Sequence, residues 1–149
     1  MIKTDKKYSQ YLQILKEELI PAMGCTEPIA MAYAAAKARA VLGKMPEKID
    51  IVISGNIIKN VKSVIVPNTG GLKGITAAIA AGVTVGNADK QLEVLADVKQ
   101  EDIPKIAEFM NSCRMTVMKS QSDKLLDIDL HLYAGSDSVR LRITDQHTN

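Results

Sequence analysis

The stretch Val66-Pro67-Asn68-Thr69-Gly70-Gly71-Leu72-Lys73-Gly74-Ile75 is the best guide to the fold, because it joins two kinds of secondary structure. The β-branched run at residues 61–66 predicts a strand, and Pro67 ends it. The alanine-rich segment 75–81 that follows favours a helix. We therefore expect a strand, a glycine-rich turn and a helix, in that order.

Three further elements are expected before this unit. Isoleucines at alternate positions in residues 49–53 predict a strand that pairs with residues 61–66 as a hairpin. Alanines dominate the segment from Pro28 to Gly43, which predicts a long helix closed by the glycine. Apolar residues at helical spacing in residues 8–19 predict an amphipathic helix that ends near Pro21.

After residue 87 the chain becomes more polar and predicts a small βαβββ unit. Its expected elements are strand 92–98, helix 101–110 and strands 115–119, 126–133 and 139–143, with the last hairpin turn at 134–137. The predicted fold class is therefore α+β, with alanine-rich helices and a β-hairpin followed by this unit. We divide the chain into residues 1–87, with the helices and the hairpin, and residues 88–149, the βαβββ subdomain.

Composition narrows the classes of partner. The 149 residues include 19 Lys and Arg against 17 Asp and Glu, a net charge of +2, and the basic residues are scattered, so nucleic acid is not expected. No stretch approaches the roughly 20 apolar residues of a membrane span. The N-terminus lacks the apolar core of a secretory signal, so a cytoplasmic location is expected. There a cysteine serves as core filler, metal ligand or nucleophile.

Cys25 is the first candidate for chemistry. It follows Gly24 and comes just before the predicted helix that starts at Pro28, and the positive end of a helix favours the thiolate form. Thr26 is suited to cap the same helix. The alternative is a small buried residue at a tight turn, since free cysteine is among the most buried residue types.

The turn Asn68-Thr69-Gly70-Gly71 is the second candidate. Glycines expose backbone N–H groups ahead of a helix, and these groups can hold a carboxylate or a phosphate together with the Asn and Thr side chains. Lys73 would add a cation. The sequence matches neither a P-loop nor a dinucleotide-binding fingerprint, so a plain strand-to-helix turn is the alternative.

The other cysteine and the two histidines form no motif. Cys113 follows the predicted helix 101–110 without a ligand-type neighbour at metal-binding spacing, and we interpret it as core filler. His131 lies in a predicted strand and His147 near the chain end. Neither histidine belongs to a zinc motif.

Taken together, Gly24-Cys25-Thr26-Glu27-Pro28 and the later Val66–Ile75 stretch resemble the L-cysteine desulfidases and iron–sulfur L-serine dehydratase alpha chains, N-terminal portion only. The resemblance implies an enzyme that eliminates sulfide from cysteine or water from serine, leaving pyruvate and ammonia. It also implies a [4Fe–4S] cluster on three cysteines with one open iron as Lewis acid. Cys25 matches the first of these ligands.

The resemblance further implies how the remaining site is distributed. Asn68, Thr69, Gly70 and Gly71 are candidates for the substrate carboxylate, with Thr26 supporting the Cys25 turn and His147 near the active site. The resemblance makes residues 1–87 the N-terminal part of a lyase catalytic region and residues 88–149 an α+β subdomain truncated at its C-terminal end. The other cluster cysteines would lie in a C-terminal helical region that this sequence lacks. We therefore expect a fragment that holds no cluster by itself, whose partners are a small amino acid, the missing helical region and further copies of the chain in a homo-oligomer. The general base is not identified.

Two other classes of function fit the same sequence. The βαβββ pattern suits a non-catalytic small-molecule-binding or regulatory module, which would bind an amino acid without turnover. The alanine-rich helices suit a structural assembly domain in which they form a subunit interface.

Overall fold

A five-stranded mixed sheet forms the framework of the protein, seen in a computed structural model that describes residues 8–15, 27–61, 64–121 and 126–144. The strands lie in the order β1-β5-β4-β2-β3. The neighbouring pairs β5–β4 and β4–β2 are antiparallel, whereas the outer pairs β1–β5 and β2–β3 are parallel. The strands are β1 (Tyr8–Leu15), β2 (Lys48–Ile53), β3 (Arg114–Lys119), β4 (Asp127–Ala134) and β5 (Asp137–Thr144).

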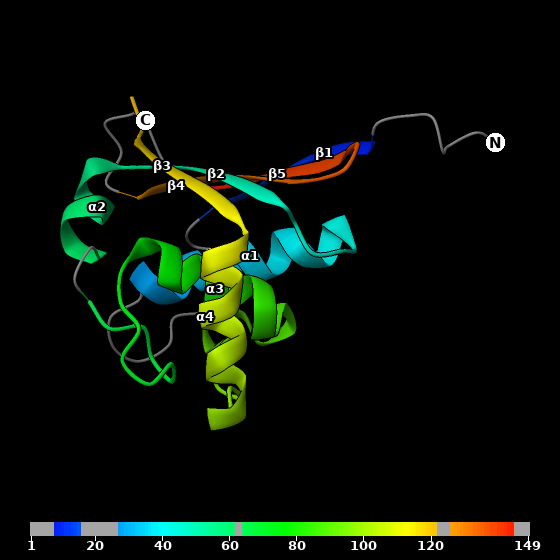
Figure 1. Ribbon diagram of the computed structural model, residues 1–149. Coiled ribbons are helices and arrows are strands. Elements are labelled where there is room, and N and C mark those ends of the chain that lie inside the picture. Colours follow the sequence, from blue (N-terminus) through cyan, green and yellow to red (C-terminus); the bar gives the residue numbers. More distant parts are fainter. Residues whose placement is uncertain (1–7, 16–26, 62–63, 122–125, 145–149) are drawn as a thin grey trace.

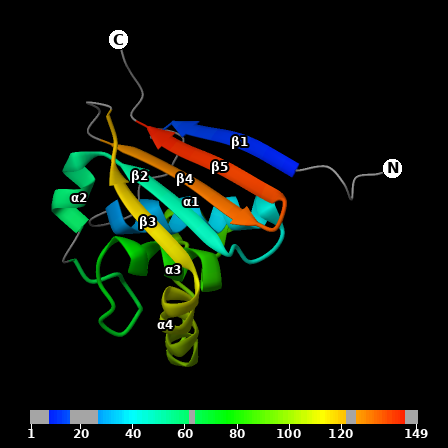
Figure 2. The same ribbon diagram turned by 45° about the horizontal axis from the view of Figure 1, so that its top comes forward.

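Helices pack against one side of this sheet (Figures 1 and 2). They are α1 (Glu27–Leu42), α3 (Ile75–Val85) and α4 (Ile103–Ser112), while the short α2 (Gly55–Val61) follows β2. Two 3-10 segments, η3 (Ala88–Glu93) and η4 (Gln100–Asp102), join α3 to α4. Alternate residues of β2, β4 and β5 turn toward the helices and are fully buried, which places the core between the sheet and the helix layer.

Helices α1 and α3 approach each other closely because their facing residues are small. Eight alanines are completely buried, four in α1 and four in α3: Ala32, Ala34, Ala35, Ala38, Ala77, Ala78, Ala80 and Ala81. Gly82 of α3 is buried beside them. A Cβ atom at Gly82 would overlap the backbone carbonyl of Ala32. The alanine-rich segments thus form a tight helix pair rather than a bulky core.

The α+β class predicted from the sequence is confirmed. Alanine-rich helices occupy α1 and α3, and Gly43 ends α1 with a φ of 81°, as expected for a glycine helix stop. The order helix, strand, strand, strand at the C-terminal end also matches, as α4, β3, β4 and β5. Because β1 and β2 pair with these later strands, one sheet combines the two parts of the chain; the division at residue 87 stays a prediction.

Three expected elements differ from the structure. Residues 8–15 form strand β1 instead of a helix, with Leu12 and Ile14 packed against the core and Tyr11 exposed. In the expected strand 61–66, Val61 ends α2 and Ile65 forms one isolated bridge with Lys73, while residues 62 and 63 lie outside the described residues. Strand β2 pairs with β3 and β4 instead. Residues 92–98 form 3-10 and turn structure, not a strand.

Within the described ranges, no helix has both the length and the apolar character needed to cross a membrane.

Candidate functional site

The turn before α3 is closed by backbone hydrogen bonds. The N–H of Val66 donates to the carbonyl of Leu72 at 2.8 Å, and the N–H of Gly74 donates to that of Val64 at 3.1 Å. Four residues inside this loop have a positive φ: Asn68 (64°), Gly70 (72°), Gly71 (107°) and Gly74 (96°). A left-handed backbone is costly for residues with a side chain, so the glycines are what allow such a tight reversal.

The two polar side chains of the turn hold its shape. The buried Thr69 hydroxyl donates to the Val66 carbonyl at 2.7 Å, and the Asn68 amide donates to the Leu95 carbonyl at 2.9 Å. The second bond ties the turn to the segment that follows η3. Thr69 is therefore a structural residue of the turn, whereas Pro67, Asn68, Gly70 and Gly71 are exposed.

The two exposed glycines differ in their surroundings. A Cβ at Gly70 would meet Cδ1 of Ile103, the first residue of α4, at 2.9 Å, so Gly70 lies against that helix. A Cβ at Gly71 would meet nothing within 4 Å. Open space therefore lies above Gly71, next to the exposed Lys73.

The structure thus brings together four predicted site residues, Asn68, Thr69, Gly70 and Gly71, in one turn. Cys25, Thr26 and His147 lie outside the described residues, so their predicted roles stay predictions.

Cys113 is a buried residue at the C-terminal end of α4. Burial raises the pKa of its thiol to about 11, which disfavours the thiolate that metal binding or nucleophilic attack requires. This environment agrees with its interpretation as core filler. In the part of the chain that the structure describes, no three His, Cys, Asp or Glu side chains are grouped so as to hold a metal ion.

A second polar cluster lies on the side of the sheet away from α1, α3 and α4, which we call the open face. Strand pairing places its residues in rows across the sheet, such as Met118, Val52, Asp129, Arg142 and Gln13. The neighbouring rows add Tyr11, Lys48, Asp50, Arg114, Thr116, Asp127, His131, Tyr133, Ser138 and Arg140.

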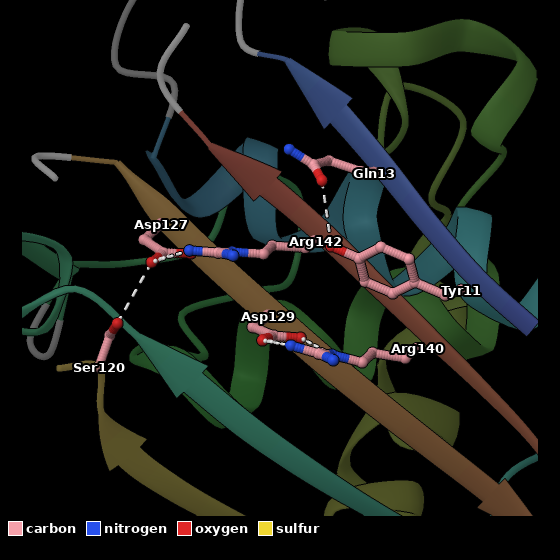
Figure 3. Close-up of polar contacts among 7 residues, drawn as sticks. All are labelled: Tyr11, Gln13, Ser120, Asp127, Asp129, Arg140 and Arg142. Carbon is pink, nitrogen blue, oxygen red and sulfur yellow. Dashed lines mark hydrogen bonds and ion pairs between the residues drawn. The ribbon is translucent and has the colours of Figure 1, made fainter. Parts of the chain in front are cut away.

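Two arginines of β5 reach diagonally to two aspartates of β4 on this face (Figure 3). Arg142 donates from Nε and Nη2 to the two carboxylate oxygens of Asp127, both at 2.9 Å. Arg140 binds Asp129 in the same bidentate way, at 2.9 and 2.7 Å. These bonds raise the pKa of both guanidinium groups above the ordinary arginine value, so both remain charged.

The aromatic residues of the open face interact with these charged rows. The rings of His131 and Tyr133 stack with centroids 4.2 Å apart, and the Tyr133 hydroxyl donates to Asp50 at 3.3 Å. Lys48 lies over the Tyr133 ring, and Arg140 lies over the Tyr11 ring, with 5.1 and 4.9 Å between charge centre and ring centroid. Burial is the main cause that lowers the pKa of His131, partly offset by the carboxylate of Asp50.

Sequence reasoning did not identify this face. The available signal was two acidic residues at alternate positions in one strand, Asp127 and Asp129, and two basic residues at alternate positions in the next, Arg140 and Arg142. The two strands were already expected to form a hairpin. Side chains two positions apart lie on the same face of a strand. Acidic residues in one strand and basic residues in its neighbour therefore predict ion pairs across the two strands.

Comparisons place the chain beside longer bacterial proteins. It is 52% identical over all 149 residues to a UPF0597 protein of Desulfitobacterium hafniense (strain Y51), covering 35% of that relative. Identity is 48% over 143 residues to a UPF0597 protein of Treponema denticola and 44% over 145 residues to one of Fusobacterium nucleatum, covering 33% and 34% of them. The chain thus spans about a third of the length of the curated relatives it matches. No protein-family model and no solved structure matches it.

These relatives correct the family expected from the sequence. They are named UPF0597 proteins, not cysteine desulfidases or serine dehydratases, and no lyase or iron–sulfur term appears in their names. The assignment to the desulfidase and dehydratase family, with its lyase and iron–sulfur description, was therefore wrong. A short motif such as Gly24–Pro28 was too small a basis for a family, whereas the similarity to UPF0597 proteins covers nearly the whole chain. The coverage is consistent with the expectation that this chain is part of a larger protein.

Proposed function

We propose that the whole protein is an enzyme that removes the β-substituent of a small L-amino acid, and that the turn Asn68–Gly71 of this chain binds the substrate carboxylate. The observation that carries the proposal is the exposed backbone of Gly70 and Gly71, held in a tight reversal just ahead of the buried helix α3. A helix N-terminus and left-handed turn residues together favour an anionic group.

Each residue of the turn has a separate part in this proposal. Asn68 and Thr69 fix the backbone through their bonds to Leu95 and Val66, so the N–H groups of the glycines are set before the ligand arrives. Lys73, exposed beside the turn, supplies a positive charge for the carboxylate. A fixed carboxylate would leave the Cα and Cβ atoms of the substrate free to face the reacting groups of the longer protein.

Cysteine and serine are the substrates to compare, because sulfide or water leaves from the same carbon in each. Elimination also requires a base that takes the α-proton, and we place that base in the two thirds of the protein outside this chain. We expect the isolated chain to show no turnover.

Cys25 as a ligand of a [4Fe–4S] cluster is an untested prediction. The residues that the structure describes do not fit such a cluster, because Cys113 is buried with a raised pKa and no ligand group surrounds it. No step proposed for the turn depends on a cluster. Iron and acid-labile sulfide in the purified full-length protein, with and without Cys25→Ser, would test the prediction independently of turnover.

The turn is tested by Gly71→Ala in the full-length protein, with sulfide and pyruvate from L-cysteine and pyruvate from L-serine as readouts. Because the new methyl group would point into the space proposed for the carboxylate, we expect KM to rise at least about tenfold. Gly135→Ala is the control, since Gly135 also has a positive φ and open space around it but lies in the β4–β5 turn.

Equal KM values for the two variants and the unchanged protein would contradict the role of the turn. Turnover of neither amino acid would contradict the enzymatic proposal. Reversible binding of the amino acid without turnover would support the small-molecule-binding alternative instead.

A further inference from the structure

The open face of the sheet lacks the cover that the opposite face has. Helices α1, α3 and α4 all lie on the other side (Figures 1 and 2), and among the described residues no helix crosses the open face. The sheet is mixed, and its two outer pairs, β1–β5 and β2–β3, are parallel. Sheets made wholly of parallel pairs are covered on both faces. This arrangement indicates that a further layer packs there.

The chemistry of the open face fits a protein surface as its partner. Tyr11 and Met118, at opposite edges of the sheet, are 49% and 52% exposed, and the aromatic pair of His131 and Tyr133 lies between them. Tyr, Met and Arg are enriched in protein interfaces. Nucleic acid is a poorer fit, because Arg140 and Arg142 both bind aspartates on the same face.

The paired charges also lower the cost of covering this face. An unpaired arginine would lose its water when a partner docks, whereas each guanidinium here already has a bidentate carboxylate. The aspartate–arginine pairs can therefore stay intact under a docked layer, while Tyr11 and Met118 gain apolar contact.

The length of the relatives indicates what this layer is. The chain spans only 33–35% of these relatives, so about two thirds of each longer protein lies outside the region that matches this chain. We infer that the open face is the docking surface for this remaining part of the same polypeptide. Interfaces between domains of one chain typically bury about 600–1,500 Å², an area that a five-stranded sheet face can supply. The inference does not depend on the proposed amino-acid chemistry.

Hydroxyl-radical footprinting of the full-length protein tests the inference, with each side chain compared with the same residue in an unfolded peptide. Methionine and tyrosine are both oxidised readily, so Met118 and Tyr11 report on the two edges of the open face. We expect oxidation of both to be slowed at least about tenfold. Met118 and Tyr11 oxidised at the rates that exposures of 52% and 49% imply would overturn the inference.

A pair of variants checks that the protection comes from docking. Met118→Lys would place a charge in the proposed interface, and we expect oxidation of Tyr11 to rise at least fivefold in that variant. Met45→Lys is the control, since Met45 is similarly exposed but lies in the segment between α1 and β2. An unchanged oxidation rate of Tyr11 in Met118→Lys would count against the inference.

A second copy of the protein is the other conceivable occupant, and dilution separates the two. Footprinting is repeated at concentrations where light scattering shows monomers. Docking within one polypeptide predicts that Met118 and Tyr11 stay protected in the monomer. Protection lost on dissociation would assign the face to a subunit interface and overturn the inference.

Discussion

Asp127 and Asp129 each pair with an arginine of β5, but their surroundings differ. The Asp127 side chain is only 2% exposed and also accepts a hydrogen bond from the Ser120 hydroxyl at 3.2 Å (Figure 3). The Asp129 side chain is 18% exposed, and the side chain of its partner Arg140 is 46% exposed. Water screens the second pair far more than the first, so the two pairs should contribute differently to stability.

Replacing Asp127 tests this difference. In Asp127→Asn the side chain keeps its size but loses its charge, and its amide group can no longer accept both bonds from Arg142. We expect the free energy of unfolding to fall by about 2 kcal/mol, because a buried partner is left poorly satisfied. Urea denaturation followed by circular dichroism measures the change.

Asp129→Asn is the matched control, because Asp129 lies two residues further along β4 on the same face. An exposed pair typically contributes about 0.2–1 kcal/mol, so its loss should stay within that range. Equal losses for the two variants would show that burial does not distinguish the pairs.

His131 predicts a dependence of stability on pH. Its pKa is lowered by burial from the ordinary value of 6.5, so the folded protein binds this proton less readily than the unfolded chain does. The stability that His131 contributes is therefore complete above pH 6.5 and is lost as the pH falls through the lowered pKa. We expect the free energy of unfolding to decrease on acidification below that pH.

The contribution of His131 is isolated by comparing the unchanged protein with His131→Gln in urea denaturation from pH 7.5 to 5. Glutamine does not titrate in this range, so the decrease should be smaller in the variant. Parallel pH profiles for the two proteins would rule out this role of His131.

At the scale of elements, the close approach of α1 and α3 depends on Gly82. In Gly82→Ala the new methyl group overlaps the backbone of Ala32, and the helices must separate. We expect a loss of about 3 kcal/mol, at the upper end of the cost of overpacking. Gly43→Ala is the control, because its site is open and only its φ of 81° is unfavourable, at about 1–2 kcal/mol. Thermal denaturation that ranks Gly43→Ala as the worse variant would contradict this account.

Elements with a single clear period were predictable from the sequence. The alanine runs of α1 and α3 and the alternating residues of β4 and β5 each fit one type of structure. Residues 8–15 fit two, since Tyr8, Leu12 and Leu15 suit a helix while Leu12 and Ile14 suit a strand. Pairing with β5, about 130 positions later in the sequence, decided in favour of the strand, and local sequence carries no information about that partner.

The candidate site was predictable only in part. The turn was identified because glycines between an expected strand and an expected helix indicate a chain reversal, and the positive φ values of Gly70, Gly71 and Gly74 confirm a constrained turn. The inward position of Thr69 was not predictable, because it depends on which carbonyls lie within reach after folding. Glycine-rich turns and short cysteine motifs recur in unrelated proteins, which explains the incorrect family assignment.

At the scale of the whole molecule, β1 is the edge strand of the sheet and pairs with β5. Removing residues 1–15 would make β5 the edge strand in place of β1, and β5 carries the fully buried apolar residues Val139, Leu141 and Ile143. An apolar edge strand with unpaired backbone groups promotes association. We expect this variant to self-associate and to unfold more readily. Light scattering after size-exclusion chromatography, with removal of residues 1–7 as the control, measures the effect. A monomer of unchanged stability after the longer deletion would show that β1 is dispensable.

The parallel pairing of β1 with β5 also sets an order of events during synthesis. Tyr8 lies beside Asp137, so β1 leaves the ribosome long before the strand it pairs with has been translated. At about 5–20 residues per second, β1 waits roughly 6–26 seconds for β5. Throughout that interval the nascent chain carries an unpaired strand with an apolar side. The sheet is therefore completed only once translation has passed Thr144, and slowing translation ahead of β5 should lengthen the period in which β1 can pair with another nascent chain.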